Sequence, residues 1–132
     1  MDLKVSTQNG RVPVTVIQVD GKIDSSSYEV FQAKAEELIK DGSRYFLIDL
    51  SHAPYISSAG LRALHTLFNQ LRSLSPDVSD EEMQRGINAG TYKSPHLKLL
   101  NLSKDARTAF EMAGFDMYIE VFDDMKKAIE AF

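Results

Sequence analysis

The fold of this chain is decided by the segment Tyr45-Phe-Leu-Ile-Asp-Leu-Ser-His-Ala-Pro-Tyr-Ile-Ser-Ser-Ala-Gly-Leu-Arg-Ala-Leu64. Its first six residues form a nearly continuous apolar run, which predicts a strand that is buried on both faces. A short polar turn containing Pro54 follows, and from Leu61 onward the apolar residues recur at helical spacing. This order of strand, turn and helix places Ser57 and Ser58 at the N-terminus of the helix.

The helix that begins at this serine pair is predicted to be amphipathic. Its apolar stripe contains Leu61, Leu64, Leu67, Phe68, Leu71, Leu74 and Ser75. The N-terminus of a helix carries unpaired N–H groups and a partial positive charge, so it accommodates anions such as phosphate. The serine pair is therefore the strongest candidate for the working site.

Length and composition limit the classes of protein to which the chain can belong. Its 132 residues fit one compact domain with its own core, and its net charge of −4 argues against a dedicated nucleic-acid binder. The lack of cysteine excludes disulfides, thiolate nucleophiles and cysteine metal sites. No segment approaches the roughly eighteen apolar residues of a membrane span, and the first residues lack a secretory pattern. We therefore expect a cytoplasmic protein with no membrane span and no direct contact with nucleic acid.

The rest of the chain alternates predicted strands with predicted helices. Strands are expected at residues 3–8, 12–19, 97–102 and 117–122, and Asn9-Gly10 joins the first two in a hairpin. Helices are expected at residues 28–40, at residues 104–113 with Ala113 on the inner face, and after a cap at Asp123. This order predicts an α/β fold with a mixed, mostly parallel sheet of about five strands, packed with four main helices.

Residues 76–96 interrupt this alternation between the second main helix and the fourth strand. The sequence Ser79-Asp-Glu-Glu82 matches a capping box, which predicts one or two helical turns to about Arg85. A mobile loop is the competing interpretation, although a loop of this length is unusual in so compact a domain. Both interpretations stay open on the sequence.

The central segment resembles a known family. Asp49-Leu-Ser51, followed by Tyr55-Ile-Ser-Ser-Ala-Gly-Leu-Arg62, is similar to the signature of STAS domains of the bacterial anti-anti-sigma factor type, also called anti-sigma factor antagonists. The resemblance extends to residues 14–24, which end in Gly21-Lys-Ile-Asp24, and to residues 101–114. It implies a single STAS domain over residues 1–132, with residues 76–96 as an insertion.

The resemblance implies a phosphorylation switch. Such domains bind an anti-sigma factor that is also a serine kinase of the GHKL type, and this binding frees the sigma factor. The kinase phosphorylates a serine in the turn before the helix and so weakens the complex, and a metal-dependent serine phosphatase of the PPM type resets it. Matched residue by residue, the acceptor is Ser58, with Ser57 as the second choice, and no cofactor is implied.

This sequence departs from the family pattern at two positions. Ser57 stands where the family commonly has Asp, and Ala59 stands where it has a second hydroxyl. The first change keeps a helix cap but removes a fixed charge, and the second removes a competing phosphate acceptor. We further expect one partner-binding patch, formed by Asp24, Ser25, Ser26, Ser57, Ser58, Gly60, Leu61 and Arg62, because loops after successive parallel strands lie at the same end of a sheet.

Other interpretations of the same residues stand beside this one. A serine pair before an amphipathic helix, or the run Asp24-Ser-Ser-Ser27, commonly serves only as a helix cap. Asp49, His52 and either serine are the residue types of a hydrolase triad, but the Gly-x-Ser-x-Gly turn is absent. Since no glycine-rich phosphate loop is present either, we expect a binding module and not an enzyme. The alternative within the family is an unphosphorylated regulatory or structural subunit of another complex, such as a lipid transporter.

Overall fold

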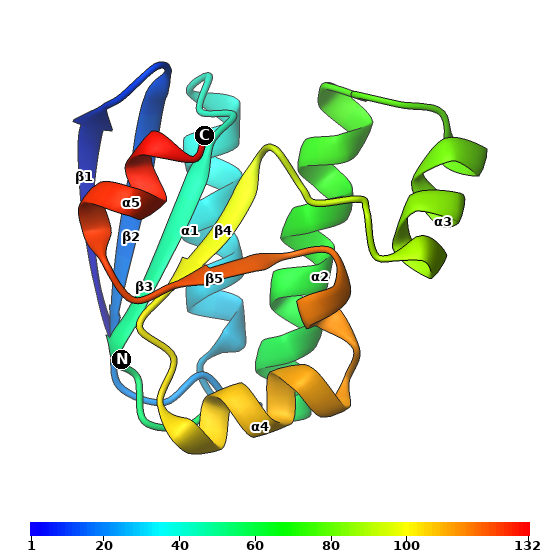
Figure 1. The fold of residues 1–132 in the computed structure, drawn as a ribbon. Coiled ribbons are helices and arrows are strands. Elements are labelled where there is room, and N and C mark those ends of the chain that lie inside the picture. Colours follow the sequence, from blue (N-terminus) through cyan, green and yellow to red (C-terminus); the bar gives the residue numbers. More distant parts are fainter.

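The computed structural model describes all 132 residues and contains one five-stranded sheet (Figure 1). The strands are β1 (Asp2–Asn9), β2 (Pro13–Asp20), β3 (Phe46–His52), β4 (Leu97–Leu100) and β5 (Glu120–Phe122), and they lie side by side in that order. The β1–β2 pair is antiparallel and the other three pairs are parallel. The predicted α/β class and the mixed, mostly parallel sheet are therefore confirmed.

The connections between the strands are mostly helical. The helices are α1 (Tyr28–Lys40), α2 (Ser58–Leu74), α3 (Asp80–Ala89), α4 (Lys104–Met112) and α5 (Met125–Glu130), and a short 3-10 turn, η1, spans Phe115–Met117. The four predicted main helices correspond to α1, α2, α4 and α5. None of the helices is long and apolar enough to span a lipid bilayer.

Both faces of the sheet are covered, as the apolar run at the start of β3 predicts. Alternate residues of this strand enter two separate clusters: Phe46 and Ile48 lie in the large one and Leu47 in the small one. The large cluster packs α1, α2 and α4 against one face through side chains such as Phe31, Leu64 and Phe110. The small cluster places α5 on the other face, which is the front face in Figure 1.

Several predicted boundaries are wrong by a few residues. Strand β4 ends at Leu100 and not at residue 102, because Asn101 adopts a left-handed conformation with φ of 59°. Strand β5 begins at Glu120 and not at Met117, since Met117 ends η1 and a turn follows it. The cap of α5 is Asp124 and not Asp123. The carboxylate of Asp124 accepts hydrogen bonds from the backbone N–H groups of Lys126 and Lys127.

Two side chains that were expected to face the core are exposed. Leu74 lies in the last turn of α2 and is 52% exposed, although it fits the apolar stripe of that helix. Ala113 follows the last residue of α4 and is also exposed. Both residues lie at helix ends, where a residue can keep the helical spacing after the helix has passed the core.

The segment after α2 is helical and packed, which decides between the two interpretations left open by the sequence. Helix α3 runs four residues beyond the predicted Arg85, and the hydroxyl of Ser79 caps it by accepting from the N–H of Glu82 at 3.1 Å. Three side chains of the segment, Val78, Met83 and Ile87, pack against the large cluster, and Tyr92 is buried in it.

Arg72 ties this segment to the end of α2. Its guanidinium donates to the carbonyl of Val78 at 2.8 Å and pairs with Asp80 at 3.2 Å. Figure 1 shows α3 beyond α2, at the side of the domain away from β1. The segment is thus part of the packed domain, and its status as an insertion relative to the family stays a prediction.

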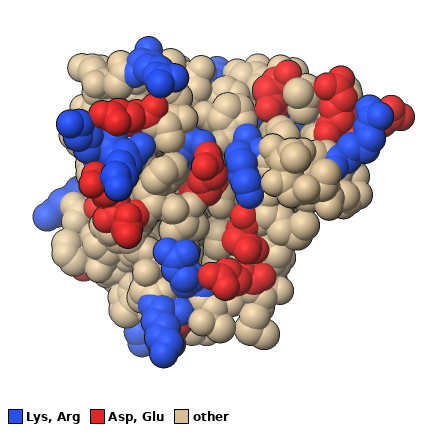
Figure 2. All heavy atoms as spheres, viewed as in Figure 1, with Lys and Arg blue, Asp and Glu red and all other residues tan.

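Acidic and basic side chains are intermingled over the face shown in Figure 2. No extended field of Lys and Arg covers that face. This distribution matches the net charge of −4.

Candidate partner-binding site

The predicted patch lies where β2 and β3 end, at the lower edge of the sheet in Figure 1. Residues 21–27 follow β2 and residues 53–57 follow β3; we call these two segments the loop pair. Parallel strands bring such loops to the same edge of a sheet. The loop pair is joined by backbone hydrogen bonds, since the N–H of Ile23 donates to Tyr55 at 3.2 Å and that of Ser57 to Ile23 at 2.9 Å.

The two serines occupy different environments at the start of α2. Ser57 is the N-cap, and its hydroxyl accepts a hydrogen bond from the N–H of Gly60 at 3.3 Å. Ser58 is the first helical residue, and its exposed hydroxyl makes no hydrogen bond. The first turn of α2 contains no acidic residue, so the positive end of the helix is not compensated by its own side chains. The capping role and the accessible hydroxyl therefore belong to different serines, as the sequence predicts.

The first half of the loop pair is held by the carboxylate of Asp24. This group accepts hydrogen bonds from the hydroxyl of Ser26 at 2.6 Å, from the N–H of Ser26 at 2.9 Å and from the hydroxyl of Ser27 at 3.3 Å. The hydroxyl of Ser26 and then its N–H are the main causes that lower the pKa of Asp24 below its usual value. Ser25 is exposed and makes no side-chain hydrogen bond. The carboxylate thus fixes the loop, and Ser25 is available to a partner.

Three predicted patch residues in the first turns of α2 differ in accessibility. Gly60 is buried and contacts Ile23, so it shapes the patch from below and presents no surface to a partner. Leu61 is half-buried and packs against the large cluster. Arg62 is exposed and has no ion pair or hydrogen bond, so its guanidinium is free to contact a partner.

Two further residues of this edge were missed by the sequence analysis. Tyr55 lies in the turn between Ala53 and Ser57 and is 49% exposed, although it is aromatic. Ser103 braces the same turn, because its hydroxyl donates to the carbonyl of Pro54 at 3.1 Å while it caps α4. Only Tyr55 had a local signal, an aromatic residue beside a proline in a turn; the contact of Ser103 joins positions 49 residues apart.

The residue types of a hydrolase triad do not form one. Asp49 is buried and its carboxylate accepts from the N–H and the hydroxyl of Ser51 at 3.0 and 2.7 Å. The Nδ1 atom of His52 lies 2.8 Å from the side-chain amide of Gln18. The histidine is thus paired with an amide, and neither serine of the helix start is hydrogen-bonded to it. No group of three or more acidic or histidine side chains is placed to hold a metal ion.

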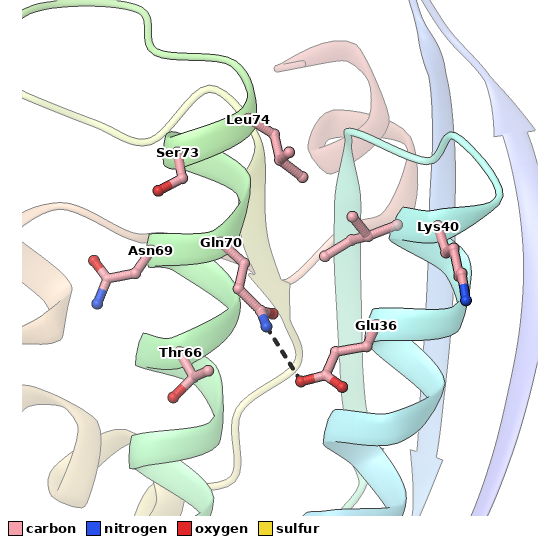
Figure 3. A pocket seen from close by; sticks show the side chains of 8 residues that line it. Glu36, Lys40, Thr66, Asn69, Gln70, Ser73 and Leu74 are labelled. Atoms are coloured by element: carbon pink, nitrogen blue, oxygen red, sulfur yellow. Dashed lines mark hydrogen bonds between the residues drawn. The ribbon is translucent and has the colours of Figure 1, made fainter.

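A separate groove lies between the C-terminal halves of α1 and α2 (Figure 3). Gln70 reaches across it and donates to the carboxylate of Glu36 at 3.2 Å. Ile39 and Leu74 provide its apolar surface. Since Ser58 begins α2, this groove lies toward the other end of that helix and does not belong to the loop pair.

Residues 4–78 match the family described as STAS domain. A candidate anti-sigma factor antagonist of Bordetella bronchiseptica, BtrV, is 27% identical over 114 residues, which cover 86% of this chain and 82% of that protein. Two solved structures at low identity share the fold. A candidate anti-sigma factor antagonist of Thermotoga maritima has a TM-score of 0.74 at 12% identity, over 97% of this chain and 92% of that one. SpoIIAA of Bacillus, solved in its phosphorylated form, has a TM-score of 0.65 at 16% identity, and the match covers 98% of this chain and 97% of SpoIIAA.

Proposed function

Because the chain belongs to the STAS domain family, we propose that it is an anti-sigma factor antagonist controlled by phosphorylation of Ser58. In its unphosphorylated form it binds an anti-sigma factor that is also a GHKL-type serine kinase, and the sigma factor is released. A PPM-type phosphatase removes the phosphate and restores binding. The similarity to BtrV supports the general role. The proposed role places the protein in the cytoplasm.

The observation that carries this proposal is the difference in hydrogen bonding between the two serine hydroxyls. The hydroxyl of Ser57 is occupied as the cap of α2, whereas that of Ser58 is exposed and has no partner. A kinase can therefore reach Ser58 without breaking a hydrogen bond of the fold. Ser57 would have to give up its cap before it could accept phosphate, so it is the less suitable acceptor.

Phosphorylation at Ser58 is compatible with the folded domain. A phosphoserine carries a charge of about −1.5 to −2 at neutral pH, and the N-terminus of a helix stabilises negative charge. The first turn of α2 holds no carboxylate that would repel it. Binding is then lost at the contact itself, through charge repulsion, desolvation and lost fit, while the domain keeps its structure.

The partner surface consists of the loop pair and the exposed start of α2. Asp24, Ser25 and Ser26 lie in one loop, and the backbone hydrogen bond from the N–H of Ser57 to the carbonyl of Ile23 fixes that loop against the serine pair. A partner that covers this surface buries Ser58 in the same contact. A single phosphate is therefore enough to disturb the interface.

The test uses serine kinases encoded near the gene. The protein is incubated with each kinase and ATP, and the phosphate is mapped by mass spectrometry; we expect it on Ser58. The affinity for the same kinase is then measured by calorimetry before and after modification, and we expect a loss after it. Phosphate on Ser57, or equal affinity of both forms, would contradict the proposal. A stable complex with no modification by any kinase would favour the unphosphorylated regulatory or structural subunit.

A further inference from the structure

Strand β1 forms an open edge of the sheet. It runs for eight residues from Asp2 to Asn9, without proline and without a register shift against β2. It lies first in the strand order, and no hydrogen bond from a loop, turn or cap reaches its outer side. Edge strands are commonly short, bulged or covered, because a free row of N–H and C=O groups pairs with other strands. The backbone groups on the outer side of β1 are therefore free to form hydrogen bonds with a further strand.

The residues that present this free row can be identified. The N–H of Thr15 in β2 donates to the carbonyl of Tyr45, so Thr15 turns its backbone groups toward β3. The direction alternates along a strand, and even-numbered residues of β2 consequently bond to β1. Their partners in β1 are also even-numbered, for example Ser6 opposite Val16. The groups that point outward belong to Leu3, Val5, Thr7 and Asn9.

We propose that two copies of this chain pair through β1 as antiparallel strands, with Val5 opposite Val5 of the second copy on the two-fold axis. In this register Leu3 lies opposite Thr7, so residues with outward groups face one another and each such pair exchanges two hydrogen bonds. The charged residues are also accommodated, since Lys4 lies opposite Ser6 and Asp2 opposite Gln8. No like charges are opposed.

The neighbouring registers fit less well. A shift of two residues in one direction places Lys4 opposite Lys4, and like charges directly opposite each other destabilise a strand pair. A shift in the other direction places Leu3 opposite Asn9 and separates the two valines. Lys4 therefore disfavours the first alternative register, and the loss of the Val5–Val5 contact disfavours the second.

Packing supports a second copy as the occupant of this edge. Val5 is 40% exposed and lies beside Ile17 of β2, which is fully buried in the large cluster. Leu3 is already packed against that cluster from the edge. Pairing two copies covers both Val5 side chains and continues the apolar face from one copy into the other.

The assembly is expected to close at two subunits. The opposite edge of the sheet is β5, which has three residues and cannot match an eight-residue strand. An interface that uses the same strand of both copies closes on itself and leaves no β1 edge free. Because one strand pair buries little surface, we expect a weak dimer that depends on concentration.

The chain contains no cysteine, which permits a direct test by disulfide crosslinking. In the proposed register the Cα atoms of two paired Val5 residues lie about 5.5 Å apart, within the range that a disulfide requires. The matched control is Thr7→Cys, whose two copies lie about 13 Å apart along the strands. Under mild oxidation we expect Val5→Cys to form covalent dimers at least about tenfold faster than Thr7→Cys.

A second experiment introduces opposite charges at Val5. Val5→Lys and Val5→Glu are each expected to sediment as monomers, because like charges then oppose each other on the axis. An equimolar mixture should sediment as a dimer, since the two variants place opposite charges there. The proposal is overturned if the unsubstituted chain sediments as a monomer at all concentrations, if both cysteine variants crosslink equally, or if mixing restores no dimer. None of these readouts depends on Ser58 or on a kinase.

Discussion

A Cβ atom on Gly60 would lie 2.7 Å from the carbonyl oxygen of Ile23 and 2.8 Å from Cγ2 of Ile56. The same carbonyl accepts the hydrogen bond from Ser57 at 2.9 Å. The first turn of α2 thus packs directly against the backbone of the loop that carries Asp24. Only glycine permits this approach, which explains the Ser-Ala-Gly-Leu sequence at the helix start in structural terms.

We predict that Gly60→Ala lowers the free energy of unfolding by about 1–3 kcal/mol, because the added methyl group would overlap backbone and a branched side chain. Urea denaturation followed by circular dichroism provides the measurement. The control is Ser58→Ala, two residues earlier in the same turn and exposed. An unchanged midpoint for Gly60→Ala would show that the turn can widen without cost.

Substitution of the two serines by alanine is predicted to affect the stability of the domain to different degrees. Ser57→Ala removes the cap of α2 and should cost about 0.5–2 kcal/mol. Ser58→Ala should cost little, because its hydroxyl has no partner and alanine favours the helix. Thermal and urea denaturation of both variants tests this prediction. Equal losses would mean that Ser58 also takes part in capping.

For phosphorylation and partner binding, we expect Ser58 to matter more than Ser57. Ser58→Ala is expected to bind the anti-sigma factor at full affinity and to stay bound in the presence of ATP, since it cannot be phosphorylated. Ser58→Asp should weaken binding only partly, because a carboxylate has less charge and fewer acceptor oxygens than a phosphate. Calorimetric titration with and without ATP gives both results. Dissociation of Ser58→Ala on addition of ATP would argue for another acceptor.

Arg62 is predicted to contribute to partner binding without supporting the fold. Arg62→Glu reverses the charge of a guanidinium that has no ion pair in the chain, so affinity for the partner should fall while the melting temperature stays nearly constant. Arg85→Glu is the matched control, because Arg85 is exposed on α3, far from the loop pair in sequence. Equal affinities of the two variants would place Arg62 outside the interface.

Two tyrosines are predicted to set the alkaline limit of stability. Burial raises the pKa of Tyr118 to about 12, and burial together with the nearby Asp77 carboxylate raises the pKa of Tyr92 to about 12. Since tyrosines in the unfolded chain ionise near their ordinary value of about 10, the folded state should lose stability as the pH rises from about 10 to 12. Urea denaturation across this range should show a smaller loss for Tyr92→Phe and for Tyr118→Phe. Identical pH dependence in all three proteins would contradict the prediction.

The sequence predicted those features that depend on local spacing. The apolar run ending at Leu50 and the helical period from Leu61 were sufficient to define β3 and α2. The cap at Ser57 could also be predicted, because capping requires only a hydroxyl at the correct position before the helix. These features need no knowledge of the distant parts of the chain.

Features that depend on tertiary contacts could not be predicted. Helix α3 continues beyond Arg85 because Met83 and Ile87 pack against a core formed by residues far away in the sequence. The burial of Gly60 depends on Ile23, and Ser103 reaches a carbonyl at position 54. The local sequence pattern around each of these residues is compatible with several environments. Which environment each residue occupies is determined by tertiary contacts in the folded chain.

The antiparallel pairing of β1 with β2 brings Asp2 opposite Asp20, and Met1 lies against Gly21 at the start of the loop pair. The last residue, Phe132, packs beside Tyr45 at the opposite end of β3. A fluorophore, affinity tag or sensor surface attached to the first residue would therefore lie beside Gly21, at the start of the loop pair. Attachment after Phe132 leaves the loop pair uncovered, so the affinity for the partner should be higher in that orientation.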